Sequence, residues 1–302
     1  MRNVIQKIET LRTATASGTI SMQAETVYRL KSNDVPKKDV LSVAKTAGIL
    51  AAKKTWDLLP YCHPLPIDGI DVDFKIGACD VSVEARVTTI WKTGVEMEAL
   101  TAVSVALLTI YDMLKPIDPD MEMSGIRLLE KRGGKSSFRD SIPVGLKVVV
   151  IVTSDGTAAG TREDKSGKVI CERLASYGVT HLDYVILPDD RERIVATLCR
   201  FANDGYHMVV TTGGTGLGPR DVTVEATREV IDREVPGIAE TMRRFGQART
   251  PYAMLSRGIV GLAGSTLMIN LPGSSRGVAE SMDAIFPAVF HAYPMMNGGG
   301  HP

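Results

Sequence analysis

Residues 147–156 read K-V-V-V-I-V-T-S-D-G, and this stretch decides the fold of the second half of the chain. A short run of β-branched residues that ends in a polar turn is typical of a buried strand. Two further apolar segments, 183–187 and 207–211, have the same character, and a helical segment follows each of the first two strands. This βαβαβ order predicts an α/β unit whose mainly parallel sheet carries helices on both faces.

Three loops are the candidate ligand sites of this sheet, because ligands bind beyond the carboxyl ends of parallel strands. They are residues 154–156, 188–190 and 211–221. The third loop begins T-T-G-G-T-G, and its glycines would let backbone N–H groups approach an anion closely while the threonines add hydroxyl donors. The motif is neither a Walker A loop nor G-x-G-x-x-G. A purely structural turn is the alternative, but its place after a strand favours ligand binding.

Two aspartates, Asp189 and Asp221, stand in neighbouring loops of this set and are candidates for a metal site. Mg²⁺ is commonly held by one or two carboxylates together with substrate phosphates. Each aspartate taken alone could instead be a helix N-cap.

The first half of the chain shows no regular βαβ order, and its length suits a separate domain. Helices are expected at 39–54 and 96–115, and two strands within 71–90 around a turn at Gly77. This mixture predicts an α+β fold. A polar segment rich in chain breakers, 133–143, places the domain boundary between Phe138 and Gly145, so the expected domains are 1–140 and 145–302.

Composition excludes several classes of protein. Lys plus Arg and Asp plus Glu number 35 each, so no global basic field indicates a nucleic-acid partner. The four cysteines form no C-x-x-C pair, which fits a reducing compartment. No run reaches the ~18 apolar residues of a membrane span. We therefore expect a soluble, cytoplasmic protein with no membrane partner.

The long helix of the first half carries a candidate acid/base pair. Asp112 and Lys115 are three residues apart and share a helix face, and Glu98 points roughly the same way. Each member of an aspartate–lysine pair shifts the pKa of the other, which suits proton transfer. A surface salt bridge is the more common meaning of this spacing.

A second candidate site is Tyr61-Cys62-His63, which two prolines bracket. A rigidly held imidazole suits binding or proton transfer, although a buried histidine in a stiff turn is the alternative. Lys37 and Lys53 flank the preceding helix and could meet a polyphosphate, or they could simply be solvated.

Together these stretches resemble the cyclic pyranopterin monophosphate synthase (MoaC) family. The resemblance is carried by A-G-I-L-A-A-K-K-T-W-D-L-L-P-Y-C-H-P-L and K-T-G-V-E-M-E-A-L-T-A-V-S-V-A-L-L-T-I-Y-D-M-L-K. It implies a ferredoxin-like fold, a hexamer of three dimers with active sites between subunits, and conversion of 3′,8-cyclo-7,8-dihydro-GTP to cyclic pyranopterin monophosphate with release of pyrophosphate. No tightly bound cofactor is implied. The implied catalytic residues are Asp112, Lys115, Lys37, Lys53 and His63, and the implied pocket residues are Tyr61, Cys62, His63, Met97 and Glu98.

The second half resembles the MogA/MoaB family. The matching pieces are V-T-S-D-G, G-T-R-E-D-K-S-G, L-P-D-D, T-T-G-G-T-G-L-G-P-R-D-V-T-V-E-A-T and I-N-L-P-G-S. They imply a three-layer α/β sandwich, usually trimeric, that uses ATP and Mg²⁺ to adenylylate molybdopterin. The implied binding residues are Ser154, Asp155, Asp164, Ser166, Asp189, Thr212, Gly213, Gly214, Thr215, Gly216 and Asp221, with Asp189 and Asp221 as the Mg²⁺ ligands.

Two resemblances to one pathway predict a bifunctional enzyme of molybdenum cofactor biosynthesis. A different class of function stays open for the second half, which could be a non-catalytic molybdopterin-binding or scaffold module. Because dimers and trimers must share symmetry axes in a closed assembly, we expect six identical chains per particle.

Overall fold

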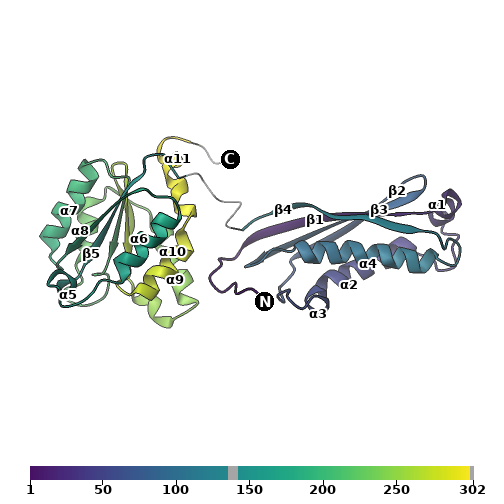
Figure 1. Ribbon diagram of the computed structural model, residues 1–302, viewed down its shortest axis with the longest axis horizontal. Helices are drawn as coiled ribbons and strands as arrows, with labels where there is room; N and C mark the ends of the chain where they lie inside the picture. Colours follow the sequence, from purple (N-terminus) through teal and green to yellow (C-terminus); the bar gives the residue numbers. More distant parts are fainter. Residues whose placement is uncertain (135–141, 300–302) are drawn as a thin grey trace. The chain divides into compact units, whose positions relative to one another are not determined.

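The computed structural model describes residues 1–134 and 142–299. The chain divides into two compact units, Met1–Ser137 and Phe138–Pro302 (Figure 1). The expected boundary between Phe138 and Gly145 begins among residues 135–141, which lie outside the described residues. The limits 1–140 and 145–302 therefore stay a prediction.

The first unit is a four-stranded antiparallel sheet in the order β2-β3-β1-β4 with helices packed on it. Its strands are β1 (Thr10–Ser21), β2 (Gly69–Ile76), β3 (Asp80–Trp91) and β4 (Glu122–Arg132). Its helices are α1 (Ala24–Lys31), α2 (Val40–Lys53), α3 (Thr55–Leu58) and α4 (Glu96–Leu114). The predicted helices α2 and α4 and the hairpin β2–β3 are confirmed, and with them the α+β class.

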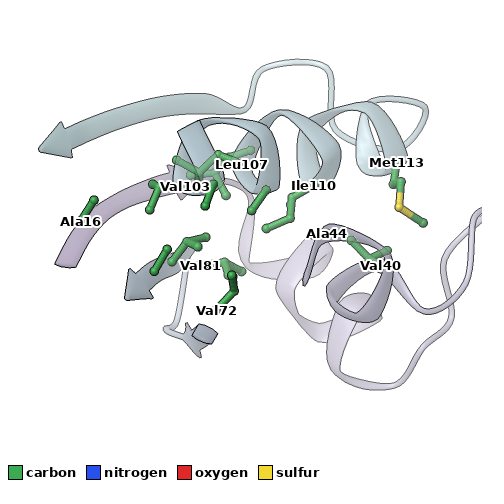
Figure 2. Packing of buried hydrophobic residues seen from close by; sticks show 14 of the residues in the cluster. Ala16, Val40, Ala44, Val72, Val81, Val103, Leu107, Ile110 and Met113 are labelled. Atoms are coloured by element: carbon green, nitrogen blue, oxygen red, sulfur yellow. The ribbon is translucent and has the colours of Figure 1, made fainter. Parts of the chain in front are cut away.

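The core of this unit lies where α4 crosses the sheet. Figure 2 shows Val103, Leu107 and Ile110 of α4 in the same apolar cluster as residues of the strands and of α2. Gly18 of β1 lies directly under the helix, since a Cβ there would come within 2.8 Å of Leu107 Cδ1. The length and apolar composition of α4 alone would suit a membrane span. Its buried residues pack in this core instead.

The second unit is a six-stranded sheet in the order β6-β5-β7-β10-β9-β8. The first four strands of that order are parallel, and β9 and β8 add antiparallel partners at one edge. The strands are β5 (Lys147–Thr153), β6 (His181–Leu187), β7 (Met208–Thr212), β8 (Arg233–Glu234), β9 (Val260–Ala263) and β10 (Thr266–Leu271). The mainly parallel sheet expected from the βαβαβ order is confirmed.

Helices cover both faces of this sheet (Figure 1). They are α5 (Asp155–Ala158), α6 (Ser166–Ser176), α7 (Arg191–Asn203), α8 (Thr223–Val230), α9 (Pro236–Gln247), α10 (Ser275–Ile285) and α11 (Ala292–Met296), with 3₁₀ turns η2 (Pro251–Leu255) and η3 (Ala288–His291). Val148 and Val150 of β5 pack in the cluster with α6, α9 and α10, whereas Val149 and Ile151 pack with α7 and α8. A strand buried on both faces needs a continuous apolar run, which explains the sequence of β5.

Candidate active sites

The candidate acid/base pair of the first unit is a three-membered ion cluster near the end of α4. Lys37 Nζ lies 2.8 Å from Asp112 Oδ2, and Lys115 Nζ lies 2.8 Å from Asp112 Oδ1. Lys37 also donates to the backbone oxygen of Asp112 at 3.2 Å. Hydrogen bonds from Lys115 and then Lys37, reinforced by their charges, lower the pKa of Asp112 to about 2. The same contact with Asp112 raises the pKa of Lys115.

Met97 and Glu98 stand in the first turn of the same helix, and Cys62 lies near Glu98. Glu98 is 4% exposed, and burial raises its pKa to about 7, with the nearby charge of Glu96 adding to the shift. Burial, followed by the charge of Glu98, raises the pKa of the Cys62 thiol. His63 is half-buried, so the alternative of a buried histidine in a stiff turn does not describe it. Tyr61 and Met97 are exposed.

These two groups do not meet within one chain. Glu98 and Asp112 are fourteen residues apart on one straight helix, which at 1.5 Å per residue separates them by about 21 Å. Helix α2 runs antiparallel to α4, because Lys37 contacts Asp112 at one end while Gly48, farther along, lies against Ala102. Lys53, at the far end of α2, therefore belongs with Glu98 rather than with Asp112.

The candidate site of the second unit is a pocket of about 720 Å³ at the carboxyl ends of the parallel strands. Eight of the eleven implied residues line it: Ser154, Asp164, Ser166, Asp189, Thr212, Gly213, Gly214 and Asp221. The other three, Asp155, Thr215 and Gly216, are not among its lining residues. The sheet thus brings most of the expected residues together.

Two glycines of this pocket are required by their surroundings. Gly213 has φ +100°, and a Cβ there would come within 2.2 Å of the Thr153 backbone oxygen. Gly214 has φ +60°, and its Cβ would come within 2.1 Å of Thr223 Oγ1. Any side chain at either position would collide with the end of β5 or the start of α8, so the backbone itself forms this wall of the pocket.

Among the described residues, Asp189 has one carboxylate oxygen without a hydrogen-bond partner. Its Oδ2 accepts a hydrogen bond from the Asp155 backbone N–H at 3.0 Å. Its Oδ1 is buried and has no hydrogen-bond partner among the described residues. Burial raises the pKa of Asp189, and the charges of Asp155 and Asp221 add to the shift. The N-cap of α7 is the next residue, Asp190, which accepts from Arg193 N–H at 3.0 Å, so the N-cap alternative for Asp189 is wrong.

Asp221 closes a tight turn. Its Oδ2 accepts from the Gly218 N–H at 2.8 Å, and its own N–H donates to the Gly218 oxygen at 3.0 Å. Helix α8 begins after Val222 and has no side-chain cap, so Asp221 is not an N-cap either. No contact within the described residues engages Asp221 Oδ1.

Asp164 and Ser166 face the pocket, but their polar atoms are already engaged. The Asp164 carboxylate accepts from Tyr184 Oη at 2.6 Å, from Ser166 Oγ and Gly167 N at 3.0 Å, and from Lys168 N at 3.1 Å. Burial opposes ionisation of Asp164, but these four donors outweigh it and lower its pKa. Asp164 therefore holds the start of α6 rather than offering a free ligand atom.

Two basic residues of the pocket, Arg162 and Lys165, were not among the predicted site residues. Both stand in the quoted stretch G-T-R-E-D-K-S-G, so their charge within a matched motif was the signal that could have found them. The backbone N–H of Arg162 donates to the Gly156 oxygen at 3.0 Å, which fixes its loop against α5. Ser274, the N-cap of α10, also lines the pocket.

A divalent cation fits this pocket only with ligands from outside the chain. Within residues 1–134 and 142–299, no group of three or more His, Cys, Asp and Glu side chains could hold a metal ion. Asp189 Oδ1, buried and without a partner, is an oxygen that a cation would satisfy, and Asp221 lines the same pocket. Mg²⁺ typically takes few protein oxygens and completes its shell with water and phosphate.

The folds and sites define a two-unit protein that joins a carboxylate–lysine cluster to a pocket with a glycine-rich wall. Residues 1–134 match the MoaC family, and residues 149–291 match a family described as a probable molybdopterin binding domain. The molybdenum cofactor biosynthesis bifunctional protein of Chlorobaculum tepidum is 44% identical over 301 residues, covering 100% of this chain and 96% of that protein. The chain therefore belongs to the family of bifunctional molybdenum cofactor biosynthesis proteins.

Each unit also has separate relatives. The cyclic pyranopterin monophosphate synthase of Desulfitobacterium hafniense is 56% identical over 137 residues, covering 45% of this chain and 84% of that enzyme. The crystal structure of the molybdopterin biosynthesis enzyme MoaB from Thermus thermophilus is 44% identical, covers 51% of this chain and 97% of its own, and has a TM-score of 0.46. The two family resemblances expected from the sequence are confirmed.

Proposed function

We propose that the chain catalyses two steps of molybdenum cofactor biosynthesis. The first unit converts 3′,8-cyclo-7,8-dihydro-GTP to cyclic pyranopterin monophosphate and releases pyrophosphate. The second unit transfers an adenylyl group from ATP to molybdopterin. Full-length similarity to bifunctional relatives supports the pairing.

The Lys37–Asp112–Lys115 cluster is the observation that carries the first activity. At neutral pH Asp112 is ionised and Lys115 is charged, so Lys115 is the proton donor of the pair. When Lys37 turns to a substrate phosphate, Asp112 loses one of its two cations, and its pKa rises toward a value suited to accepting a proton. Lys53 adds phosphate binding, while Tyr61, Cys62, His63, Met97 and Glu98 line the far side of the site.

The separation along α4 supports an active site shared between subunits. Asp112 and Glu98, about 21 Å apart in one chain, act on the same substrate only when two chains supply them. The strand order β2-β3-β1-β4, with helices after β1 and β3, supports the ferredoxin-like assignment for this unit.

Complementation tests this arrangement. Asp112→Asn and Glu98→Gln chains, each with its own affinity tag, are co-expressed and purified together. If sites are shared within dimers, random pairing gives one intact site in half of the dimers, which is about a quarter of wild-type activity. If every site lies within one chain, the mixed particles stay as inactive as the separate variants.

The pocket of the second unit supports the adenylyl transfer. Gly213 and Gly214 offer backbone N–H donors to phosphate, and Arg162 and Lys165 add positive charge. The Thr212 hydroxyl already donates to the Pro272 oxygen at 2.7 Å and supports this wall instead. Asp189 and Asp221 would hold Mg²⁺, which neutralises charge on the ATP phosphates. The phosphate oxygen of molybdopterin attacks the α-phosphorus of ATP, and the bond to the β-phosphate oxygen breaks to release pyrophosphate.

An assay of the full-length protein with molybdopterin, ATP and Mg²⁺ separates this proposal from its alternative. The enzyme forms adenylylated molybdopterin and pyrophosphate in equal amounts. A molybdopterin-binding or scaffold module binds molybdopterin without releasing pyrophosphate at any metal concentration.

The proposal includes a cytoplasmic location and an assembly of six identical chains. Six chains contain three dimers and two trimers, so one particle satisfies the symmetry expected of both units. Light scattering should give six times the 32.6 kDa chain mass. A monomer or a single dimer at working concentration would contradict it.

A further inference from the structure

Arg257 lies outside the lining of the second-unit pocket, yet it contacts the second part of the glycine-rich loop, from Thr215 to Asp221. Its backbone N–H donates to the Thr215 oxygen at 3.1 Å. Its Nε donates to the Gly216 oxygen at 2.6 Å, and its Nη2 donates to the Asp221 oxygen at 2.7 Å. Its Nη1 pairs with the carboxylate of Glu225 on α8. One half-buried side chain thus joins the loop, the turn after it and the following helix.

The loop needs such restraint because its own sequence supplies little. Residues 213–218 include four glycines, the residue type that loses most conformational freedom on ordering. Two of them, Gly213 and Gly214, already hold positive φ. Without contacts from outside the loop, this segment would sample many conformations and would no longer form one defined wall of the pocket.

Arg257 also fixes the backbone of Asp221. The N–H and Oδ2 of Asp221 are bonded to Gly218, and its backbone oxygen is bonded to Arg257. Three of its four polar atoms are therefore fixed. Oδ1 is the atom left for a ligand, in the same pocket as the unpartnered Oδ1 of Asp189.

We propose that Arg257 is a positioning residue for the second active site: it fixes the 215–221 segment so that Asp221 and the adjoining wall at Gly213 and Gly214 are set for a metal-bound nucleotide. This inference rests on the proposed function of the pocket. The proposed role requires the arginine side chain, and a positive charge alone is not enough. Only a planar guanidinium donates in several fixed directions, here to two carbonyl oxygens and a carboxylate at once.

Four variants of the full-length protein test the inference. Arg257→Gln removes the guanidinium and its charge, and Arg257→Lys keeps the positive charge without the planar guanidinium. Glu225→Gln removes the ion-pair partner but leaves both carbonyl bonds. Arg191→Gln is the matched control, because Arg191 forms an exposed ion pair with Glu229 at 2.9 Å between α7 and α8, away from the loop.

Hydrogen exchange measures the restraint directly. The amides of Gly218, Asp221 and Thr223 are bonded within this segment, to Asp221, Gly218 and Gly214 respectively. In peptides that cover 213–223, Arg257→Gln should exchange at least about tenfold faster than wild type, while peptides of β5 are unchanged. Arg257→Lys should resemble Arg257→Gln, and Glu225→Gln and Arg191→Gln should stay near wild type.

Binding of Mn²⁺ in the presence of ATP measures the consequence for the site. Mn²⁺ binding that is present in wild type and lost in Asp221→Asn is assigned to this pocket. Arg257→Gln should weaken that binding at least about fivefold, and Arg257→Lys should not restore it.

The outcomes separate the inference from the function beneath it. Unchanged exchange in Arg257→Gln, unchanged Mn²⁺ affinity, or full rescue by lysine would each overturn the positioning role. If wild type shows no Asp221-dependent Mn²⁺ binding, the proposed metal site is refuted instead. The hydrogen-exchange rates would then still show whether Arg257 restrains the loop.

Discussion

Asp155 and Asp189 exchange hydrogen bonds in both directions: the N–H of Asp155 donates to Asp189 Oδ2, and the N–H of Asp189 donates to Asp155 Oδ1, each at 3.0 Å. The pair ties together the ends of the neighbouring strands β5 and β6. The N–H of Asp189 and then the guanidinium of Arg220 lower the pKa of Asp155, so it stays ionised. Asp189 lines the pocket, whereas Asp155 is not among its lining residues and supports Asp189 through this pair of hydrogen bonds.

Replacing Asp189 should separate activity from stability. Asp189→Asn keeps the shape and removes the charge, so we expect adenylylation to fall at least about 100-fold while the second unit becomes no less stable. Burial raises the pKa of Asp189, and an acid with a raised pKa costs stability as pH rises above its unfolded value. Asp189→Asn cannot ionise, so it does not lose stability in this way. Product assays and thermal unfolding at neutral pH check both parts, and a large loss of stability would show that the carboxylate is structural.

Asp112 is exposed, so its loss should affect catalysis without affecting folding. We expect Asp112→Asn to reduce formation of cyclic pyranopterin monophosphate at least about 100-fold at unchanged melting temperature. Asp73→Asn is the matched control, because Asp73 forms an exposed pair with Lys45 at 3.7 Å in the same unit. Activity that survives in Asp112→Asn would make the cluster an ordinary surface salt bridge.

The titration of the Asp112 carboxyl group gives a second check on the same cluster. Two lysines lower the pKa of Asp112 to about 2, so in the free protein it stays ionised throughout the usual assay range. Lys37→Met removes one lysine and should raise the pKa of Asp112 toward its ordinary value. An NMR titration of the Asp112 carboxyl should therefore show a higher midpoint in the variant. Equal midpoints would mean that Lys37 does not hold Asp112 in solution.

Arg162 and Lys165 should act on substrate binding through charge. Neutralising both as Arg162→Gln with Lys165→Gln should raise the KM of the anionic substrates about tenfold with a smaller change in kcat. The wild-type KM should also rise more steeply with salt than that of the variant, because screening weakens only the charged interaction. A KM that is unchanged would remove both residues from the binding site.

The sequence predicted those parts of the molecule that depend on local pattern. The apolar run of β5 and the glycines at 213 and 214 are local signals, and each lies where it was expected. Adjacent Asp189 and Asp190 look alike in sequence, and only the geometry shows that the second caps α7 while the first faces the pocket. Arg257 could not be found from local pattern, because its contacts join residues 32–42 positions away.

Local sequence pattern also could not tell apart the two groups of candidate residues in the first unit, one around Glu98 and one around Asp112. Helical periodicity predicted that Glu98 and Asp112 point roughly the same way, but periodicity says nothing about what covers each turn. The start of α4 lies in contact with α3, and Glu98 is buried, whereas Asp112 near the other end stays exposed. One face of a helix can therefore carry two different environments, and distance along the axis decides which residues share a site.

The buried Glu98 should make the stability of the first unit depend on pH. Burial raises its pKa from 4.5 to about 7, so between these values the folded state binds a proton that the unfolded state has released. The unit should lose stability from this group as pH rises from about 4.5 to about 7, on the order of 3 kcal/mol for the full shift. Glu98→Gln keeps the shape and cannot ionise. Its advantage in unfolding free energy over wild type should therefore grow between pH 5 and pH 8.

Tryptophan fluorescence can follow this unit alone, because both tryptophans of the chain, Trp56 and Trp91, lie in it. Urea unfolding of wild type and Glu98→Gln at pH 5 and pH 8 gives the four free energies needed. Glu25→Gln serves as control, since Glu25 is an exposed glutamate in the first turn of α1. A difference between Glu98→Gln and wild type that is the same at both pH values would show that Glu98 titrates alike in the folded and unfolded chains, and its burial would then carry no cost.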